Sequence, residues 1–573
     1  MSSKTALLGG ATACVFALTA TAAAQAATAH KHHAATKVVV VEKVNEAPAM
    51  RAELEALRQE VEQLQANQAQ SQAQAQAQVE AMRAQVAQAQ AQAQAAQAQF
   101  AEQIQTIPGT VKREVAAVAP KTDKIYYKGV TVQFGGFAAM ESVWRAHNEG
   151  ADVGSSYSGI PGPYLSQYHT GEYRMTARQS RLSLLAEANV SPAIHLTGYG
   201  EFDFMGSAVT ANSNESNSYQ PRIRNLFAAI DWDQPWGGFE FFGGQNWSLA
   251  TMTSKGIVPR SEAPPPTIEA QYVPGFVWAR QPQMRLTANI NKQLWFAVSV
   301  ENPQTTFYTS GKYNSGVALF NTVPGGSEFP SQAGIGYTLS ENKQPDVIAK
   351  VAVDQKLAGH NLHAEAFGIY RDFYVRENTG AALANVSATG GGFGGGLMLG
   401  VIPSLLDVQV SGLAGRGIGR YGSSQLPDVG FGPDGRLKPV SEWDLLAGGT
   451  VHIGKSLDFY VFGGEERDTK QPYTVSNSIY NGVGNPLLNN AGCEIEGSTC
   501  GNSTHYVDQI TAGFWDRPYV GKFGKIQWGI QYSYTERHLF PGYGTVTPGA
   551  QTFNAAPTFR ENMVFTSVRY YPF

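Results

Sequence analysis

Residues 181–205 read RLSLLAEANVSPAIHLTGYGEFDFM. Apolar and polar side chains alternate through the first ten residues, a short turn follows at Val190–Pro192, and a second alternating segment begins at Ala193. A period of two puts successive side chains on opposite faces, so the stretch predicts two β-strands joined by a tight turn. One face then carries Leu182, Leu184, Ala186 and Ala188, and the other carries Arg181, Ser183, Glu187 and Asn189.

The same unit recurs from Gly129 to Phe573, with short turns and long loops as alternate connections. This asymmetry is typical of a transmembrane β-barrel, whose strands each span about 9–11 residues. We predict an all-β barrel of sixteen antiparallel strands, with eighteen as the alternative; an even number leaves both termini on one side. The predicted strands are Val130–Trp144, Arg174–Asn189, Ala193–Met205, Pro221–Asp233, Gly238–Ala250, Arg280–Asn291, Gln293–Asn302, Asp346–Gln355, Asn361–Tyr374, Gly392–Val401, Ser404–Gly417, Glu442–Ile453, Ser456–Glu466, His505–Trp515, Gly524–Arg537 and Arg560–Phe573.

The composition supports a membrane barrel rather than a helical membrane protein. Only 15% of the residues are charged, against about 25% in soluble domains. After the N-terminus there is no run of about 20 apolar residues, which a membrane-spanning helix requires. The net charge of −4 and the absence of basic runs argue against a nucleic-acid partner. The aromatic last residue, Phe573, is typical of outer-membrane barrels.

The first 29 residues have the composition of a secretory signal peptide. Lys4 precedes the apolar segment Ala6–Thr21, and small residues allow cleavage after Ala26 or Ala29. Cys14 lies inside the apolar segment and leaves with the signal; a lipoprotein role for it is the alternative. Residues 30–46 form a linker that contains three histidines, for which metal binding is the alternative.

Residues 47–118 predict a periplasmic coiled coil that precedes the barrel. Apolar residues recur there at spacings of four and three, which places them on one stripe of a helix with charged neighbours. The stripe consists of Met50, Leu54, Leu57, Val61 and Leu64. An Ala-Gln repeat follows, for which a single low-complexity helix is the alternative, and residues 119–128 link it to the barrel.

Seven arginines crowd the early part of the barrel, and we predict that they line a pore and bind anions. Guanidinium groups suit carboxylates, and rings of them favour anions in channels. Strand alternation places Arg181 and Arg285 in the lumen, whereas the alternation in Pro221–Asp233 is ambiguous. The set is Arg174, Arg178, Arg181, Arg222, Arg224, Arg280 and Arg285. The alternative places these side chains at the level of the lipopolysaccharide phosphates.

Two long loops carry further candidate residues. Thr251–Ala279 is the third long loop and is rich in proline, so we predict that it folds inward, with Glu262 and Glu269 opposite the arginines. Cys493 and Cys500 share a later loop and predict a disulfide, which is stable in an oxidising compartment. No third cysteine or histidine has the spacing of a metal site.

Four short motifs resemble those of the DcaP-like trimeric outer-membrane porins. The resemblance covers Val130–Asn302 and includes a preceding coiled coil, although the long Ala-Gln tract and the cysteine loop depart from the family. It implies a homotrimer that passes small anions such as dicarboxylates by diffusion, with Arg178, Arg181, Arg222, Arg224 and Arg280 at matching positions. The motifs are residues 177–182 (ARQSRL), 222–224 (RIR), 243–248 (GGQNWS) and 280–283 (RQPQ).

The sequence therefore favours a porin for small, anionic solutes in the outer membrane of a Gram-negative bacterium. The expected partners are two further copies of the chain, outer-membrane lipid and lipopolysaccharide. The alternative is a structural protein that tethers the envelope to peptidoglycan through the coiled coil. Scattered histidines such as His147, His195 and His452 form no catalytic constellation, so we expect neither an enzyme nor a cofactor.

Overall fold

The computed structural model describes residues 124–206, 220–308, 318–319, 326–327, 338–340, 342–378, 383–432, 436–476, 479–544 and 553–573. It also describes nine helical residues scattered between positions 55 and 91. The chain divides into two compact units, Met1–Ala119 and Pro120–Phe573. The predicted signal peptide, the first linker and the coiled coil over Ala47–Val118 lie outside the continuously described residues. Among the described residues, no helix has both the length and the apolar character needed to cross a membrane.

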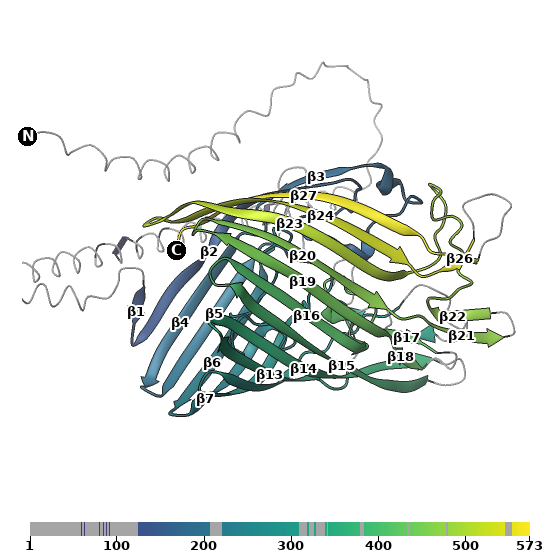
Figure 1. Ribbon diagram of the computed structural model, residues 1–573. Coiled ribbons are helices and arrows are strands. Elements are labelled where there is room, and N and C mark those ends of the chain that lie inside the picture. The colour runs from purple at the N-terminus through teal and green to yellow at the C-terminus, as the bar shows by residue number, and fades with distance from the viewer. Residues whose placement is uncertain are drawn as a thin grey trace, which may run out of the picture. The chain divides into compact units, whose positions relative to one another are not determined.

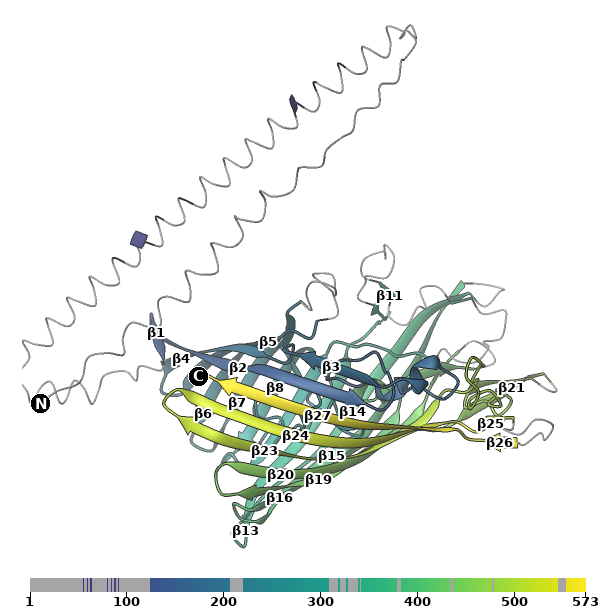
Figure 2. The ribbon, with the colours of Figure 1, turned by 90° about the horizontal axis from the view of Figure 1, so that it is seen from above.

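Sixteen antiparallel strands close into a barrel, as predicted (Figures 1 and 2). Each strand pairs with the next along the chain, and the last pairs with the first over Ala138–Arg145. Closure leaves no free edge, so every strand satisfies its backbone hydrogen bonds within the wall. The strands are β2 (Val130–Arg145), β4 (Arg181–Ser191), β5 (Ile194–Asp203), β6 (Arg222–Gln234), β7 (Gly237–Trp247), β8 (Arg280–Ile290), β9 (Leu294–Glu301), β13 (Asp346–Leu357), β14 (His360–Asn378), β15 (Leu383–Ile402), β16 (Leu406–Arg416), β19 (Ser441–Ile453), β20 (Leu457–Asp468), β23 (Thr504–Gly521), β24 (Gly524–Leu539) and β27 (Thr558–Tyr571).

Several predicted strand boundaries were wrong; β23, for example, continues to Gly521 and not only to Trp515. The segment predicted as one strand over Arg174–Asn189 is interrupted by a turn near Ser180, and its first part forms β3 (Glu172–Thr176). Both β3 and β4 pair with β2, so together they occupy one place in the barrel. The hairpin of β14 and β15 is longer than predicted, because β15 begins at Leu383 rather than at Gly392.

The two ends of the barrel differ. At the turn end the connections are short; Asn291 and Lys292, for example, have φ angles of 53° and 55°. Two successive residues with positive φ form a type I′ turn, whose twist matches that of the flanking strands. The loop end carries the hairpins β17 (Val429–Phe431) with β18 (Leu437–Pro439) and β21 (Gln471–Ser476) with β22 (Ile479–Val483), away from the C-terminus in Figure 1.

The two faces of the wall have opposite character. On β8, Met284 and Leu286 are 61% and 51% exposed and point outward. Their neighbours Arg285 and Thr287 are almost completely buried and point inward. The same alternation holds on β4, where Leu182 is on the outer face. An apolar outer surface with a polar inner one is the arrangement of a transmembrane barrel, so the predicted fold class is confirmed.

The main hydrophobic cluster lies inside the barrel. Trp247, Tyr272 and Phe276, from β7 and the loop that follows it, pack there against inward side chains of later strands. Those side chains include Leu446, Tyr460, Phe462, Trp515 and Phe565. Burial of this apolar surface stabilises an inward position of the loop.

Candidate functional site: an arginine-lined cavity in the barrel

The loop Thr251–Ala279 is anchored to several strands of the barrel wall, as expected of an inward loop. Its hydrogen bonds reach β14, β16, β20, β23 and β24. They join Thr253 N to Glu365 Oε2 (3.1 Å), Gln409 Nε2 to Ala263 O (2.9 Å), Gly275 N to Glu466 Oε1 (2.7 Å), Trp515 Nε1 to Pro266 O (2.7 Å) and Ile268 N to Gln531 Oε1 (2.6 Å). A loop held at so many points narrows the lumen.

A cavity of about 250 Å³ lies between this loop and the wall. The loop contributes Tyr272 and the prolines Pro264–Pro266 to its lining. The charged residues that line it are Arg181, Arg224, Arg517, Arg569, Glu269 and Asp458. Four guanidinium groups therefore face two carboxylates, and the cavity has a cationic lining.

Three arginines beside the cavity share two carboxylates. Arg224 is 2.6 Å from Glu201 and 3.0 Å from Asp203. Arg222 lies 2.7 Å from Asp203, and Arg181 lies 3.7 Å from Glu201. These contacts hold the guanidinium groups in place but neutralise only two of the three positive charges.

Arg280 adds a fourth guanidinium, which has no acidic partner within the described ranges. Its Nε and Nη1 atoms are buried and make no hydrogen bond there. The group lies over the rings of Trp278 (4.8 Å) and Trp247 (5.2 Å), which favour a cation on their faces. With Arg181, Arg222 and Arg224 it makes four positive charges against two carboxylates, an excess of two.

Tyr272 of the loop lies close to three of these guanidinium groups. Burial by itself raises the pKa of the Tyr272 hydroxyl. The neighbouring charges of Arg224, Arg181 and Arg280 outweigh burial and lower that pKa below its ordinary value. An environment that stabilises a phenolate is one that stabilises an anion.

A β-bulge explains why the orientation of Arg224 could not be predicted from alternation. Glu201 pairs with Asn225 and the next residue, Phe202, pairs with Ile223, so Arg224 is an extra residue in β6. A bulge of this kind shifts the side-chain alternation by one position. Arg222 and Arg224 both reach inward carboxylates as a result.

The other predicted arginines lie apart from the cavity. The side chain of Arg174 is half exposed, with its Nε 3.5 Å from Glu172. Arg178 pairs with Asp152 of the first long loop at 2.6 Å. Arg285 points inward but is buried, and it donates to Gln283 Oε1 (2.8 Å) and to a backbone carbonyl.

The two loop glutamates occupy different surroundings. Glu262 accepts a hydrogen bond from Asn246 Nδ2 (3.0 Å), and Glu269 accepts one from Ser155 N (3.2 Å). Burial raises the pKa of both carboxyl groups. Of the two, Glu269 lines the arginine cavity.

The sequence prediction missed two arginines of the cavity. Arg569 of the last strand is 2.7 Å from Glu141, and Arg517 of β23 is 2.5 Å from Asp458. The alternation of β27 gave a usable signal, because Phe565, Ser567 and Arg569 share its inward face. No comparable signal marked Arg517, which lies within an irregularity in the pairing of β23, between Asp516 and Tyr519.

Cys493 and Cys500 form a disulfide in the loop after β22. Cys493 is completely buried and packs with Ile160 and Phe559 in a small cluster. The disulfide therefore belongs to the packing of the long loops and contributes nothing to the lining of the cavity.

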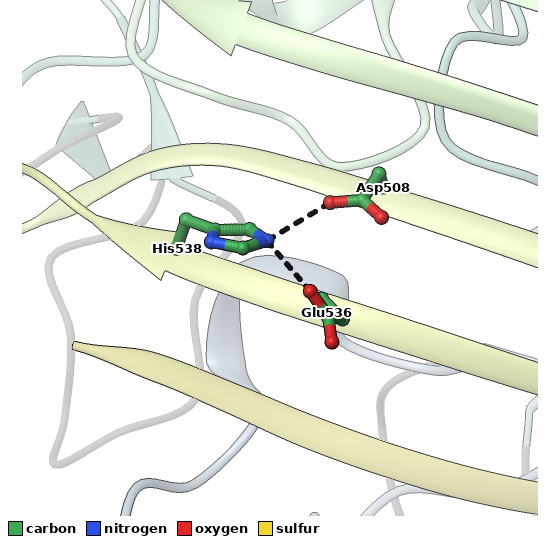
Figure 3. A group of neighbouring side chains, drawn as sticks. All are labelled: Asp508, Glu536 and His538. Atoms are coloured by element: carbon green, nitrogen blue, oxygen red, sulfur yellow. Dashed lines mark ion pairs between the residues drawn. The ribbon is translucent and has the colours of Figure 1, made fainter. Parts of the chain in front are cut away.

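A second charged group, made of Asp508, Glu536 and His538, lies on β23 and β24 (Figure 3). His538 Nε2 is 3.0 Å from Asp508 and 3.1 Å from Glu536. These residues alternate with inward side chains such as Thr535 and Gln509, so they point away from the lumen. Glu536 also pairs with Arg560 at 2.8 Å, and the group forms an ionic network on the outer surface.

Comparisons with known proteins identify the fold. No known protein family matches the sequence, and no curated protein matches it. The outer membrane channel DcaP of Acinetobacter baumannii matches with a TM-score of 0.53 at 17% identity, over 78% of this chain and 99% of that one. OprB of Pseudomonas putida matches with a TM-score of 0.43 at 9% identity, over 81% and 96%. An anion-selective porin from Comamonas acidovorans matches with a TM-score of 0.36 at 8% identity, over 77% and 99%.

Of these three structures, only the first exceeds a TM-score of 0.5. At 17% identity it establishes a shared fold. The chain is therefore a transmembrane β-barrel with the fold of an outer-membrane channel.

Proposed function

We propose that the protein is an outer-membrane porin through which small solutes diffuse passively. The support comes from an apolar outer surface, a closed wall and a lumen narrowed by the loop Thr251–Ala279. A barrel whose inner face is polar and whose loop reduces the opening is suited to selective diffusion. In this assignment the turn end faces the periplasm and the loop end faces outward.

We further propose that the channel prefers small anions, with dicarboxylate-like solutes as the expected class. The observation that carries this preference is the surplus of two positive charges among Arg181, Arg222, Arg224 and Arg280. In a narrow, partly desolvated site a surplus charge acts more strongly than in water. A bidentate guanidinium also matches the geometry of a carboxylate.

Planar-bilayer recording tests both parts of the proposal. Insertion of the purified protein should give discrete steps in conductance. In a salt gradient, the sign of the reversal potential should show that anions permeate better than cations. Succinate should reduce the chloride current if carboxylates bind in the constriction. Protein that inserts but never conducts would refute the channel and leave the envelope tether as the function.

The proposal also covers the oligomeric state of the protein and its export to the outer membrane. We infer a homotrimer of the DcaP-like family, exported by a signal peptide over residues 1–29 and carrying a periplasmic coiled coil over residues 47–118. Residues 129–573 form the barrel in contact with lipid and lipopolysaccharide. The support is the motif resemblance along Val130–Asn302 together with the shared barrel fold.

A further inference from the structure

Four acidic side chains meet on the inner face of two adjacent strands, near the loop end. Glu442 and Asp444 of β19 lie directly opposite Asp468 and Glu466 of β20. All four are at most 3% exposed. Like charges on directly opposite residues destabilise a sheet. These four carboxylates, if ionised, therefore require a compensating positive charge.

No side chain of the described residues supplies that charge. None of the four acids forms an ion pair with a lysine, arginine or histidine there, although Asp428 nearby pairs with Arg371 at 2.6 Å. Both carboxylate oxygens of Glu442, Asp444 and Asp468 are shielded from water and lack any hydrogen-bond donor. Ionised carboxylates in such a position are strongly unfavourable unless they are paired or bound to a metal.

The surroundings supply a further oxygen ligand. The hydroxyl of Ser424, from the loop after β16, is buried without a hydrogen-bond partner, and Ser424 N donates to Glu466 Oε2 at 2.8 Å. Gly419 and Gly422 of the same loop pack against the carboxylates, where a Cβ on either would overlap Glu442 or Glu466. The loop and the two strands thus enclose the carboxylates.

The spacing of these oxygens suits a metal ion. One oxygen from each of Glu442, Asp444 and Glu466 lies within 4.8 Å of the other two. Calcium binds oxygens at about 2.3–2.6 Å, so two ligands on opposite sides of the ion are about 4.6–5.2 Å apart. Three carboxylates at this spacing can therefore share one ion. Asp468 and Ser424 are the neighbouring residues that would complete its coordination shell.

We propose that Glu442, Asp444, Glu466 and Asp468 form a calcium site inside the barrel. The ligand set consists of hard oxygens, with no histidine or thiolate that would favour zinc. Magnesium retains several of its waters and requires strict octahedral geometry, so an enclosed set of carboxylates favours calcium. Because Glu466 also accepts from Gly275 N, the ion ties the inward loop to the wall.

Calorimetry and thermal unfolding test the site on the full-length protein in detergent, after treatment with EDTA. We expect saturable binding of one Ca²⁺ per chain, weaker binding of Mg²⁺, and a higher Tm in Ca²⁺ than in EDTA, because a ligand that binds the folded state stabilises it. The double variant Glu442→Gln with Asp444→Asn should lose both the binding and the Tm shift. Glu465→Gln, on the outward face of the neighbouring strand β20, is the matched control and should retain both.

Two results would overturn the proposal. The first is wild-type protein that gives no binding heat and the same Tm with and without Ca²⁺, which would mean that protons neutralise the cluster. The second is a double variant that binds Ca²⁺ as tightly as the wild type. Should the double variant fail to fold, the wild-type titration and the single variant Asp444→Asn decide the question alone.

Discussion

At the scale of single residues, the arginines of the barrel fall into two groups. Arg371 forms buried pairs with two carboxylates and contributes to the packing of the wall. The second group has fewer carboxylate partners than positive charges. Two carboxylates serve Arg181, Arg222 and Arg224, and Arg280 has no acidic partner within the described part of the chain. Selectivity therefore depends on the unneutralised charge and not on the number of arginines.

Replacement of Arg371 by alanine should destabilise the barrel strongly. The guanidinium lies 3.1 Å from Asp346 and 2.6 Å from Asp428, and its loss leaves both carboxylates buried. We expect a decrease of about 3–5 kcal/mol in the free energy of unfolding, measured by urea titration in lipid vesicles. Arg174→Ala removes a half-exposed guanidinium and serves as the control, with a change under about 1 kcal/mol. Equal losses in the two variants would contradict the structural role of Arg371.

Arg280→Met should separate stability from selectivity. The substitution keeps an unbranched side chain between Trp247 and Trp278. It removes a buried charge with two nitrogen atoms, Nε and Nη1, that have no hydrogen-bond partner among the described residues. The free energy of unfolding should stay constant or rise by about 1 kcal/mol, whereas the anion preference in bilayers should decrease. A loss of stability with unchanged selectivity would mean that Arg280 serves packing alone.

At the scale of secondary-structure elements, the inward loop depends on one close backbone contact. Gly275 has a φ of 86°, and a Cβ there would overlap the carbonyl of Leu445 on the wall. Gly275→Ala should therefore displace this part of the loop and raise the single-channel conductance. Gly454→Ala is the matched control, because this turn glycine also has a positive φ, of 64°, but open space around its Cβ. The same conductance in both variants would show that Gly275 does not set the width of the channel.

Much of the wall was predictable from the sequence, and the cavity only in part. Alternation identified all sixteen strands and the inward position of Arg181, since one buried face imposes a period of two. It failed at Arg224, where a bulge shifts the period, and over residues 383–391, which the structure adds to the start of β15. The Arg569–Glu141 pair joins the last strand to the first, and such a contact exists only after closure.

At the scale of the whole molecule, the barrel should fold without the N-terminal segment. The wall satisfies its own hydrogen bonds through the pairing of β2 with β27. Deletion of residues 47–118 should leave the heat-modifiable mobility of the folded barrel and its conductance unchanged. Loss of barrel assembly in the deletion variant would show that the segment takes part in folding.

The central claim is that surplus guanidinium charge makes this barrel an anion-preferring channel, and reversal potentials test it most directly. In Arg181→Gln with Arg280→Gln two positive charges are lost, which cancels the excess of two, while Glu201 keeps its contact with Arg224. Recording should use low salt, because screening shortens the range of the field to about 3 Å at 1 M. We predict that the reversal potential of the wild type shows a preference for anions. The reversal potential of the double variant should shift toward the value for cations. A wild type without anion preference, or a double variant with an unchanged reversal potential, would contradict the claim.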